Sequence, residues 1–175
     1  MVDDWHNTLR DLHEAAFRWA LHCAGGDQRD AEDALQSAYE AVLDGSARFD
    51  GRSSAKSFLF GVIRNKVRAQ RRRSLWRRFL GMDAGREATV GPGQWEGVQR
   101  GALVAAMSQA RGKLSPKQQE VVELVFYHDL TIEEAARAMG VGLGTARTHY
   151  ARAKDRLREE LESGGEEWIA ETTSA

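Results

Sequence analysis

The sequence predicts an all-α protein, with two small helical domains joined by a flexible linker. Apolar residues recur at intervals of three and four along most of the chain, as they do on the buried side of helices. Few segments alternate apolar and polar residues, and Pro occurs only twice, so a sheet protein is disfavoured. The length of 175 residues suits two small domains, and the hydrophobic content of 42% is enough to build their cores.

The first predicted domain covers residues 5–73 and contains three helices. The first helix ends at Gly25-Gly26, because glycine favours the left-handed turn that terminates many helices. The second helix follows Asp27, and the third covers about 55–73. The inner side of the first helix is predicted to carry Leu9, Leu12, Ala16 or Phe17, and Ala20 or Leu21. Those of the second and third helices are predicted to be Ala31, Leu35, Ala38, Tyr39 and Val42, then Leu59, Val62, Ile63 and Val67.

Residues 74–97 are predicted to form the linker, since repeated glycines would break any long helix there. The second domain covers residues 98–162, and within it Pro116 after Ser115 marks a helix start. The acidic tail, residues 163–175, leaves two alternatives open: a mobile segment, or a segment that folds back onto a basic face. The linker contains aromatic residues that are unusual for a spacer, namely Trp76, Phe79 and Trp95.

A helix-turn-helix motif is predicted for residues 131–150. Thr131 and Glu134 have the spacing of a capping box, so a helix begins there. Gly140 permits the left-handed turn that follows, and a second helix begins near Gly144. At about 100° per residue, the apolar stripe of this second helix comprises Ala146, Tyr150, Ala153, Leu157 and Leu161.

The opposite face of this second helix has the chemistry of a DNA recognition helix. It carries Arg147, Thr148, Ala151, Arg152 and Asp155. Short and cationic side chains in the first turns can reach base edges and phosphates, and Arg matches the paired acceptors of guanine. The alternative is an amphipathic helical hairpin whose polar face is only solvated.

Charge is distributed in blocks, although the net charge is only −1. Residues 52–86 contain 11 basic and 1 acidic side chain, and residues 144–158 contain 5 and 1. By contrast, residues 1–51 contain 4 basic and 11 acidic side chains, and residues 159–175 contain six acids and no base. Two basic blocks in an otherwise acidic chain indicate two contacts with a polyanion.

Two predicted helices of the first domain have strongly polar faces. The third helix is cationic on the side that carries Arg64, Asn65, Arg68, Arg71 and Arg72, and residues 49–58 before it form a polar loop with a Phe at each end. Such a surface suits a single or distorted DNA strand, or loose binding to any nucleic acid. The second helix has an acidic face, which is either solvated or a dock for a basic protein: Glu32, Asp33, Gln36, Ser37, Glu40 and Asp44.

Two blocks of the sequence resemble the sigma-70 family of RNA polymerase sigma factors, in the family's order. Residues 30–36, 49–51 and 57–65 resemble its second conserved region. Residues 114–122, 130–136, 144–148 and 152–158 resemble its fourth region. The small size and short linker resemble the extracytoplasmic-function group, which keeps only these two domains. The resemblance covers roughly residues 8–162, and two ordered motifs are more specific than a lone helix-turn-helix.

The resemblance implies a cytoplasmic sigma factor that binds core RNA polymerase and directs promoter-specific transcription initiation, with promoter recognition and strand opening. The implied partners are the β′ and β subunits of core RNA polymerase, promoter DNA and an anti-sigma factor, without membrane insertion. The polymerase contact, on the clamp helices of β′, would involve Asp30, Glu32, Asp33 and Gln36.

The resemblance also implies two DNA contacts. The contact with the minus-ten element, including a flipped base near the 53–56 loop, would involve Phe49, Ser53, Ser54, Lys56, Arg64, Asn65, Arg68 and Arg72. The contact with the minus-thirty-five element would involve Thr145, Arg147, Thr148 and Arg152.

Other functional classes find little support in the sequence. The histidines lack ligand spacing, and neither a phosphate-binding glycine loop nor a nucleophile–base motif is present, so no catalytic residue, metal site, cofactor or enzyme activity is predicted. Cys23, the single cysteine, excludes an internal disulfide. The main alternative function is a stand-alone helix-turn-helix repressor or activator, which would bind duplex DNA without polymerase.

Overall fold

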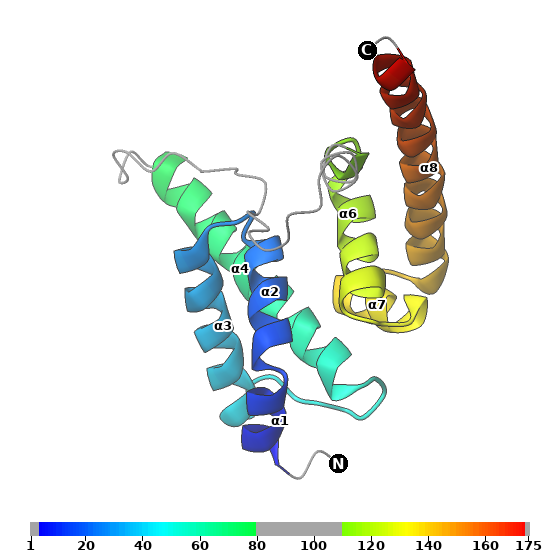
Figure 1. The fold of residues 1–175 in the computed structure, drawn as a ribbon. Helices are drawn as coiled ribbons and strands as arrows, with labels where there is room; N and C mark the ends of the chain where they lie inside the picture. Colours follow the sequence, from blue (N-terminus) through cyan, green and yellow to red (C-terminus); the bar gives the residue numbers. More distant parts are fainter. Residues whose placement is uncertain (1–3, 80–109, 174–175) are drawn as a thin grey trace. The chain divides into compact units, whose positions relative to one another are not determined.

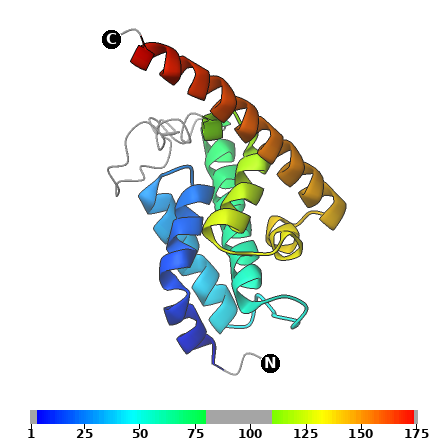
Figure 2. The same ribbon diagram turned by 45° about the vertical axis from the view of Figure 1, so that its right-hand side comes forward.

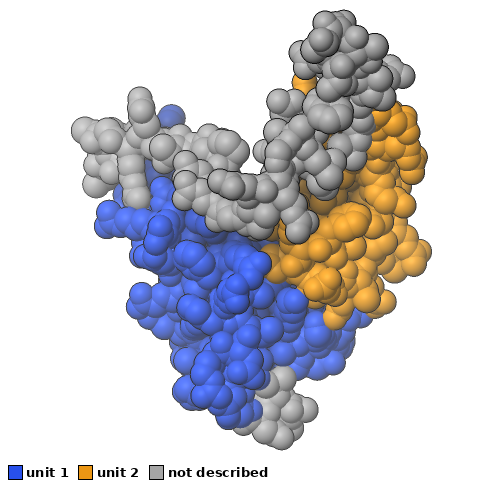
Figure 3. Space-filling model, viewed as in Figure 1, with its two compact units in different colours: residues 1–95, 137–140 blue, residues 96–136, 141–175 orange. Residues whose placement is uncertain are grey.

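A computed structural model of the chain describes residues 4–79 and 110–173 (Figure 1). Within these two ranges every regular element is a helix and no strand is present, which confirms the all-α fold class. The chain forms two compact units, residues 1–95 with 137–140 and residues 96–136 with 141–175 (Figure 3). The predicted linker from residue 80 onward, and residues 98–109 of the second predicted domain, lie outside the described residues.

Four helices build the first unit. They are α1 (Trp5–Asp11), α2 (His13–Cys23), α3 (Gln28–Leu43) and α4 (Ala55–Phe79). Each of α2, α3 and α4 packs against the other two, and α1 packs against α2 and α3 (Figure 1). The result is a three-helix bundle with a short helix, α1, that leads into α2.

The first helix is interrupted, which the periodicity did not predict. One helix was expected up to Gly25, but α1 ends and α2 begins at Leu12. The backbone there has φ −90° and ψ −2°, so ψ departs by about 40° from the helical value. The amide of Leu12 still bonds to the carbonyl of Thr8 (3.0 Å), and the carbonyl of Leu12 accepts from Ala16 (2.8 Å). The interruption is therefore a local bend, which apolar spacing does not detect.

The predicted end of α2 and start of α3 are confirmed. The amide of Gly26 bonds to the carbonyl of Leu21 (2.9 Å), and that of Gly25 to the carbonyl of His22 (3.1 Å). This is the Schellman arrangement, and it requires the positive φ of 69° at Gly25. Asp27 then caps α3, because its carboxylate accepts from the amide of Asp30 (2.9 Å).

The core of the bundle contains most of the predicted inner residues. On the first predicted helix Leu9, Ala16 and Ala20 are buried, whereas Leu12, Phe17 and Leu21 are half-buried. Among the predicted inner residues of α3 only Tyr39 is half-buried, and among those of α4 only Val62. Two large residues that the predicted stripes omitted, Trp19 and Phe60, are fully buried. Their rings stack at 5.7 Å, and the Trp19 indole Nε1 donates to the carbonyl oxygen of Phe60 (2.9 Å).

Helix α4 is longer than predicted. It continues to Phe79, six residues beyond the expected end at Arg73, so the first residues assigned to the linker are helical. The glycines that favoured a linker begin only at Gly81. Residues 74–79 contain no helix breaker, so the helix continues into them.

The second unit contains α6 (Pro116–Val122), η1 (Glu123–Tyr127), the first part of α7 (Ile132–Met139) and α8 (Leu143–Thr173). Helix α6 packs along α8 (Figure 2). Leu114, Val122 and Ala153 form a buried cluster there, with Leu157 against it. The helix start predicted at Pro116 is confirmed: the Ser115 hydroxyl accepts from the amide of Gln118, whose side chain accepts from the amide of Ser115.

A π-helical segment, η1, follows α6 directly. It ends before Asp129, a non-glycine residue with a positive φ of 54°. Beyond it, the amide of Leu130 bonds back to the carbonyl of Leu124 (3.0 Å). Short π-helical segments are rare, and hydrophobic periodicity gives no signal for them.

Helix α8 extends to Thr173, so residues 163–173 continue the helix. This corrects the boundary at residue 162 and the expectation of a separate tail. Gly164-Gly165 therefore lie inside this helix, although glycine disfavours a helix interior. No described helix combines the length and apolar character that a membrane crossing requires.

Candidate nucleic-acid interface

An aromatic cluster anchors the polar loop that precedes α4. The rings of Phe49 and Phe58 lie 5.2 Å apart, and each lies 5.7 Å from the ring of Trp5 in α1. The Trp5–Phe49 pair is edge-to-face, with an interplanar angle of 90°. All three residues are half-buried. Phe49 therefore holds one end of the loop against the bundle.

The loop itself is ordered by local hydrogen bonds. The carboxylate of Asp50 accepts from the amide of Arg52 (3.1 Å) and forms an ion pair with its guanidinium. These bonds, the backbone one above all, lower the pKa of Asp50 below its usual value. Gly51 between them has φ 73°, which favours glycine. The loop thus has a defined shape while its polar groups stay exposed.

Ser54 ends the loop and caps α4. Its hydroxyl accepts from the amide of Ser57 (3.2 Å), and its carbonyl accepts from the amide of Phe58 (3.0 Å). The ammonium of Lys56 lies 5.9 Å from the centre of the Phe60 ring. Ser53 and Lys56 are half-buried and Ser54 is exposed, so all three are accessible at the surface.

One face of α4 is cationic and exposed. Asn65, Arg68 and Arg72 are all exposed, as predicted for a strand-binding surface. Arg64, predicted to belong to the same surface, is only 2% exposed. Helix α4 contains two lysines, seven arginines and no acidic residue, so its potential is strongly positive.

The exposed face of α3 is acidic. Glu32, Asp33 and Gln36 are exposed, and Asp30 is half-buried. Glu32 accepts from the side chain of Gln28 (2.8 Å), and Gln36 donates to Glu40 (3.0 Å). Neither Glu32 nor Asp33 forms an ion pair with another described residue, so this face keeps its negative charge.

The helix-turn-helix has the predicted cap and turn. The amide of Thr131 donates to the Glu134 carboxylate (3.0 Å), and the amide of Glu134 donates to the Thr131 hydroxyl (3.2 Å). At the other end of α7, the amide of Val141 bonds to the carbonyl of Ala136 (3.0 Å) around Gly140, whose φ is 62°. Helix α8 then begins at Leu143, one residue before the predicted start.

The first turns of α8 present the predicted recognition face. Thr145, Arg147, Thr148 and Arg152 are exposed, whereas Ala146 and Ala153 are fully buried. Neither Arg147 nor Arg152 forms an ion pair within the described part of the chain.

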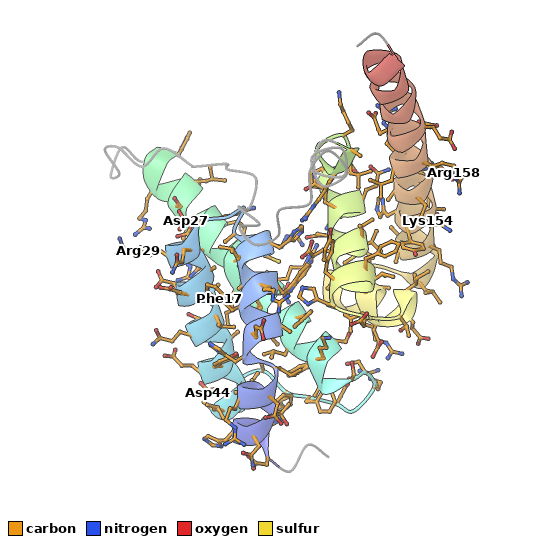
Figure 4. All side chains as sticks on the ribbon, viewed as in Figure 1. Phe17, Asp27, Arg29, Asp44, Lys154 and Arg158 are labelled. Carbon is orange, nitrogen blue, oxygen red and sulfur yellow. The ribbon has the colours of Figure 1, made fainter. Side chains whose placement is uncertain are left out.

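Further along α8 two arginines are paired with carboxylates. Arg156 pairs with Glu160 (3.0 Å), and Arg158 pairs with Asp155 (3.6 Å). Lys154 and Arg158 project from this helix in Figure 4, and the Lys154 ammonium lies 5.4 Å from the Tyr150 ring. Uncompensated positive charge is therefore concentrated near the N-terminal end of α8.

Comparisons with known proteins place both halves in one family. The sigma-70 region 2 family matches residues 7–78, and the sigma-70 region 4 family matches residues 112–159. The RNA polymerase sigma-E factor of Streptomyces avermitilis is 31% identical over 162 residues, which cover 93% of this chain and 87% of the relative. The chain belongs to the sigma-70 family.

This sigma factor is a member of the extracytoplasmic-function group. The extracytoplasmic-function RNA polymerase sigma factor RpoE of Cereibacter sphaeroides is 28% identical, with 90% of this chain and 95% of the relative covered. The fold resembles that of the sigma factor RpoE from Bartonella quintana, solved in complex with the anti-sigma factor NepR. That comparison has a TM-score of 0.66 at 24% identity and covers 92% of this chain and 98% of the other.

The function follows from the family. The protein is a sigma factor that directs transcription initiation, and a stand-alone helix-turn-helix regulator is not favoured. The first unit contains the region 2 match with the acidic face of α3 and the cationic face of α4. The region 4 match contains the cap, the turn and the exposed face of α8.

Two features of this sigma factor were missed from the sequence. Trp5 completes the aromatic cluster beside the loop, and its spacing of four from Leu9 was the available signal. A buried charged group lies at the π-helical segment: the Glu123 carboxylate is 2.9 Å from the Arg111 guanidinium and 3.8 Å from His128 Nε2. Spacings of twelve and five give no periodic signal, so only the fold shows this group.

Proposed function

We propose that this sigma factor acts through three separate surfaces, one for core RNA polymerase and two for promoter DNA. The observation that carries the proposal is the segregation of charge. The exposed face of α3 is acidic, whereas the exposed faces of α4 and of the first turns of α8 are cationic. An acidic face repels DNA, so α3 suits a basic protein partner, and the cationic faces suit a polyanion.

The polymerase contact is assigned to Asp30, Glu32, Asp33 and Gln36, against the clamp helices of β′. Three of these side chains are exposed, and the carboxylates of Glu32 and Asp33 are not neutralised within the described chain. The β subunit is proposed as a second contact, as the family resemblance implies. The protein acts in the cytoplasm, where core polymerase is found.

The minus-ten contact is assigned to the loop around Ser53, Ser54 and Lys56 together with Asn65, Arg68 and Arg72. The cluster of Trp5, Phe49 and Phe58 holds the loop in place, so a flipped base would meet a preformed surface. Arg64 stays in the proposed set, and its burial favours a role in holding this surface. Opening of the strands is driven by binding to the unpaired state, without nucleotide hydrolysis.

The minus-thirty-five contact is assigned to Thr145, Arg147, Thr148 and Arg152. The capping box of Thr131 and Glu134 and the turn at Gly140 present the N-terminal end of α8, as a recognition helix requires. Polymerase fixes the spacing of the two DNA contacts, so the second contact becomes effectively intramolecular. An anti-sigma factor is proposed as a further partner, since a solved relative of the same fold is bound to one.

Run-off transcription tests the proposal as a whole. Core polymerase with this protein should initiate at defined positions on promoter fragments from its own genome, and neither component alone should do so. Tight binding of the isolated protein to a palindromic duplex, without activity in the presence of core, would favour the stand-alone regulator.

Charge reversal tests the polymerase surface. Glu32→Lys with Asp33→Lys should weaken the binding of core polymerase at least tenfold, because two attractive charges become repulsive. Asp11→Lys is the matched control, since Asp11 is an exposed carboxylate on α1. Equal binding by both variants would remove α3 from the assignment.

A further inference from the structure

The last turns of α4 expose an aromatic pair that the functions assigned above do not use. Trp76 is 67% exposed and Phe79 is 80% exposed. Their ring centres lie 5.8 Å apart and their planes differ by only 9°, so the rings are stacked. Exposing two large aromatic side chains to water is unfavourable in free energy, so such a pair on a surface indicates a binding site. The outer faces of the stacked rings offer a flat apolar surface to a ligand.

The pair lies on the same side of α4 as the proposed strand-binding residues. At 3.6 residues per turn, Arg72, Trp76 and Phe79 fall within about 60° of one another. Asn65 and Arg68 share this side, whereas Leu59, Ile63 and Val67 are buried on the opposite one. Trp76 lies one turn beyond Arg72, about 6 Å along the helix axis.

The surroundings of the pair are cationic. Arg72, Arg73 and Arg77 are exposed around it. No acidic residue occurs anywhere in α4. Flat aromatic surface beside arginines is the combination that binds unpaired nucleic acid, because bases stack on the rings while phosphates meet the cations. An apolar protein partner would gain nothing from this concentration of positive charge.

We infer that Trp76 and Phe79 form a stacking platform for an unpaired base of promoter DNA, and so extend the minus-ten surface of α4 beyond Arg72. The inference rests on the proposed function, because it requires that the Asn65, Arg68 and Arg72 side of α4 faces the opened strand. The added contact contributes affinity by stacking, which depends little on the identity of the base.

The test uses the full chain bound to core polymerase and two versions of a promoter that run-off transcription has mapped. One version is a full duplex. In the other version the non-template strand is unpaired from the minus-ten element downstream. Trp76→Ala with Phe79→Ala should weaken binding of the single-stranded version about 5- to 150-fold, the range for loss of one stacked base. Binding of the duplex version should change less than twofold.

Two controls make the result specific. Leu75→Ala removes exposed apolar surface from the same turn, since Leu75 is 63% exposed, and should leave both affinities unchanged. Trp76→Phe with Phe79→Tyr keeps two flat rings and should retain most of the affinity. A photo-crosslinking amino acid at position 76 should label one nucleotide of the unpaired strand.

Three results would overturn the inference. Unchanged binding by the double alanine variant, with a loss in Arg72→Ala, would leave the proposed minus-ten surface intact and remove the platform. Equal losses of affinity for the duplex and the single-stranded versions would show that the contact does not depend on strand opening. Loss of core binding would show that the pair contacts polymerase. Unchanged binding in Arg72→Ala and Arg68→Ala would instead contradict the proposed minus-ten surface itself.

Discussion

The indole Nε1 of Trp19 in α2 donates a 2.9 Å hydrogen bond to the backbone carbonyl oxygen of Phe60 in α4. Both side chains are fully buried, and their rings stack. The residues are 41 positions apart, and the bond joins α2 to the helix that carries the proposed minus-ten surface. The position of α4 therefore depends on this pair.

Replacement of Trp19 by Phe should destabilise region 2 by about 2–4 kcal/mol. The change removes one buried hydrogen bond and leaves a cavity where the larger ring was. Thermal unfolding of the full chain, followed by far-ultraviolet circular dichroism, should show a lower midpoint. The same substitution at the exposed Trp76 is the matched control and should shift the midpoint little. Equal shifts in both variants would contradict the role of Trp19.

Removal of the Glu123 carboxylate should lower the free energy of unfolding by about 3–5 kcal/mol. Glu123→Ala would leave the Arg111 guanidinium facing a largely buried site without its 2.9 Å partner. Chemical denaturation measures the loss. The double variant Arg111→Met, Glu123→Leu should recover most of it, because apolar side chains of similar volume replace the pair. If the double variant is less stable than Glu123→Ala, factors other than the pair dominate at this site.

Loss of the capping box at α7 should destabilise region 4 by about 1 kcal/mol. Thr131→Ala removes the hydroxyl that accepts from the amide of Glu134 at 3.2 Å. Thr131→Ser keeps this acceptor and should retain the stability of the unaltered protein. A midpoint of thermal unfolding that falls equally in both variants would point to the lost methyl group instead.

Loss of Arg147 or Arg152 should weaken promoter binding by holoenzyme. Loss of a bidentate contact with guanine should lower discrimination at that base by about 1–3 kcal/mol. Loss of a phosphate contact should instead weaken binding to all sequences and reduce the slope of log affinity against log salt concentration by about one. Titrations at several salt concentrations, with native and scrambled minus-thirty-five elements, separate the two roles for each arginine. Arg158→Ala is the control, since Arg158 pairs with Asp155. Unchanged binding in Arg147→Ala and Arg152→Ala would remove this face of α8 from the assignment.

Alkaline pH should destabilise region 2 through Tyr39. Burial raises the pKa of Tyr39 to about 12, and its hydroxyl lies 3.2 Å from His13 Nδ1. The folded state therefore keeps the phenol proton above pH 10, where the unfolded chain loses it. The contribution of the Tyr39 phenol to the free energy of unfolding is fully present below about pH 10. This contribution is lost as the pH rises toward 12. The unfolding midpoint of Tyr39→Phe should fall less steeply over this interval, and parallel curves would exclude the effect.

Several features of this sigma factor were determined by the sequence alone. The caps at Asp27, Ser115 and Thr131 depend on side chains and amides three residues apart, so they could be predicted from local spacing. The end of α2 and the turn after α7 depend on a positive φ at glycine. The buried stripe of α3 and the exposed faces of α3, α4 and α8 depend on a regular helical period. These features carry the family resemblance.

Other features were decided only by the tertiary structure, because they join residues that the sequence separates. The Trp19–Phe60 bond, the cluster of Trp5 with Phe49 and Phe58, and the pairing of Glu123 with Arg111 each connect different elements. The burial of Arg64 could not be predicted either, since its position at the edge of the stripe fits both faces. Local hydrogen bonds and periodicity specify helices and their ends, whereas packing between helices decides which polar side chains are buried and which surfaces remain for DNA and polymerase.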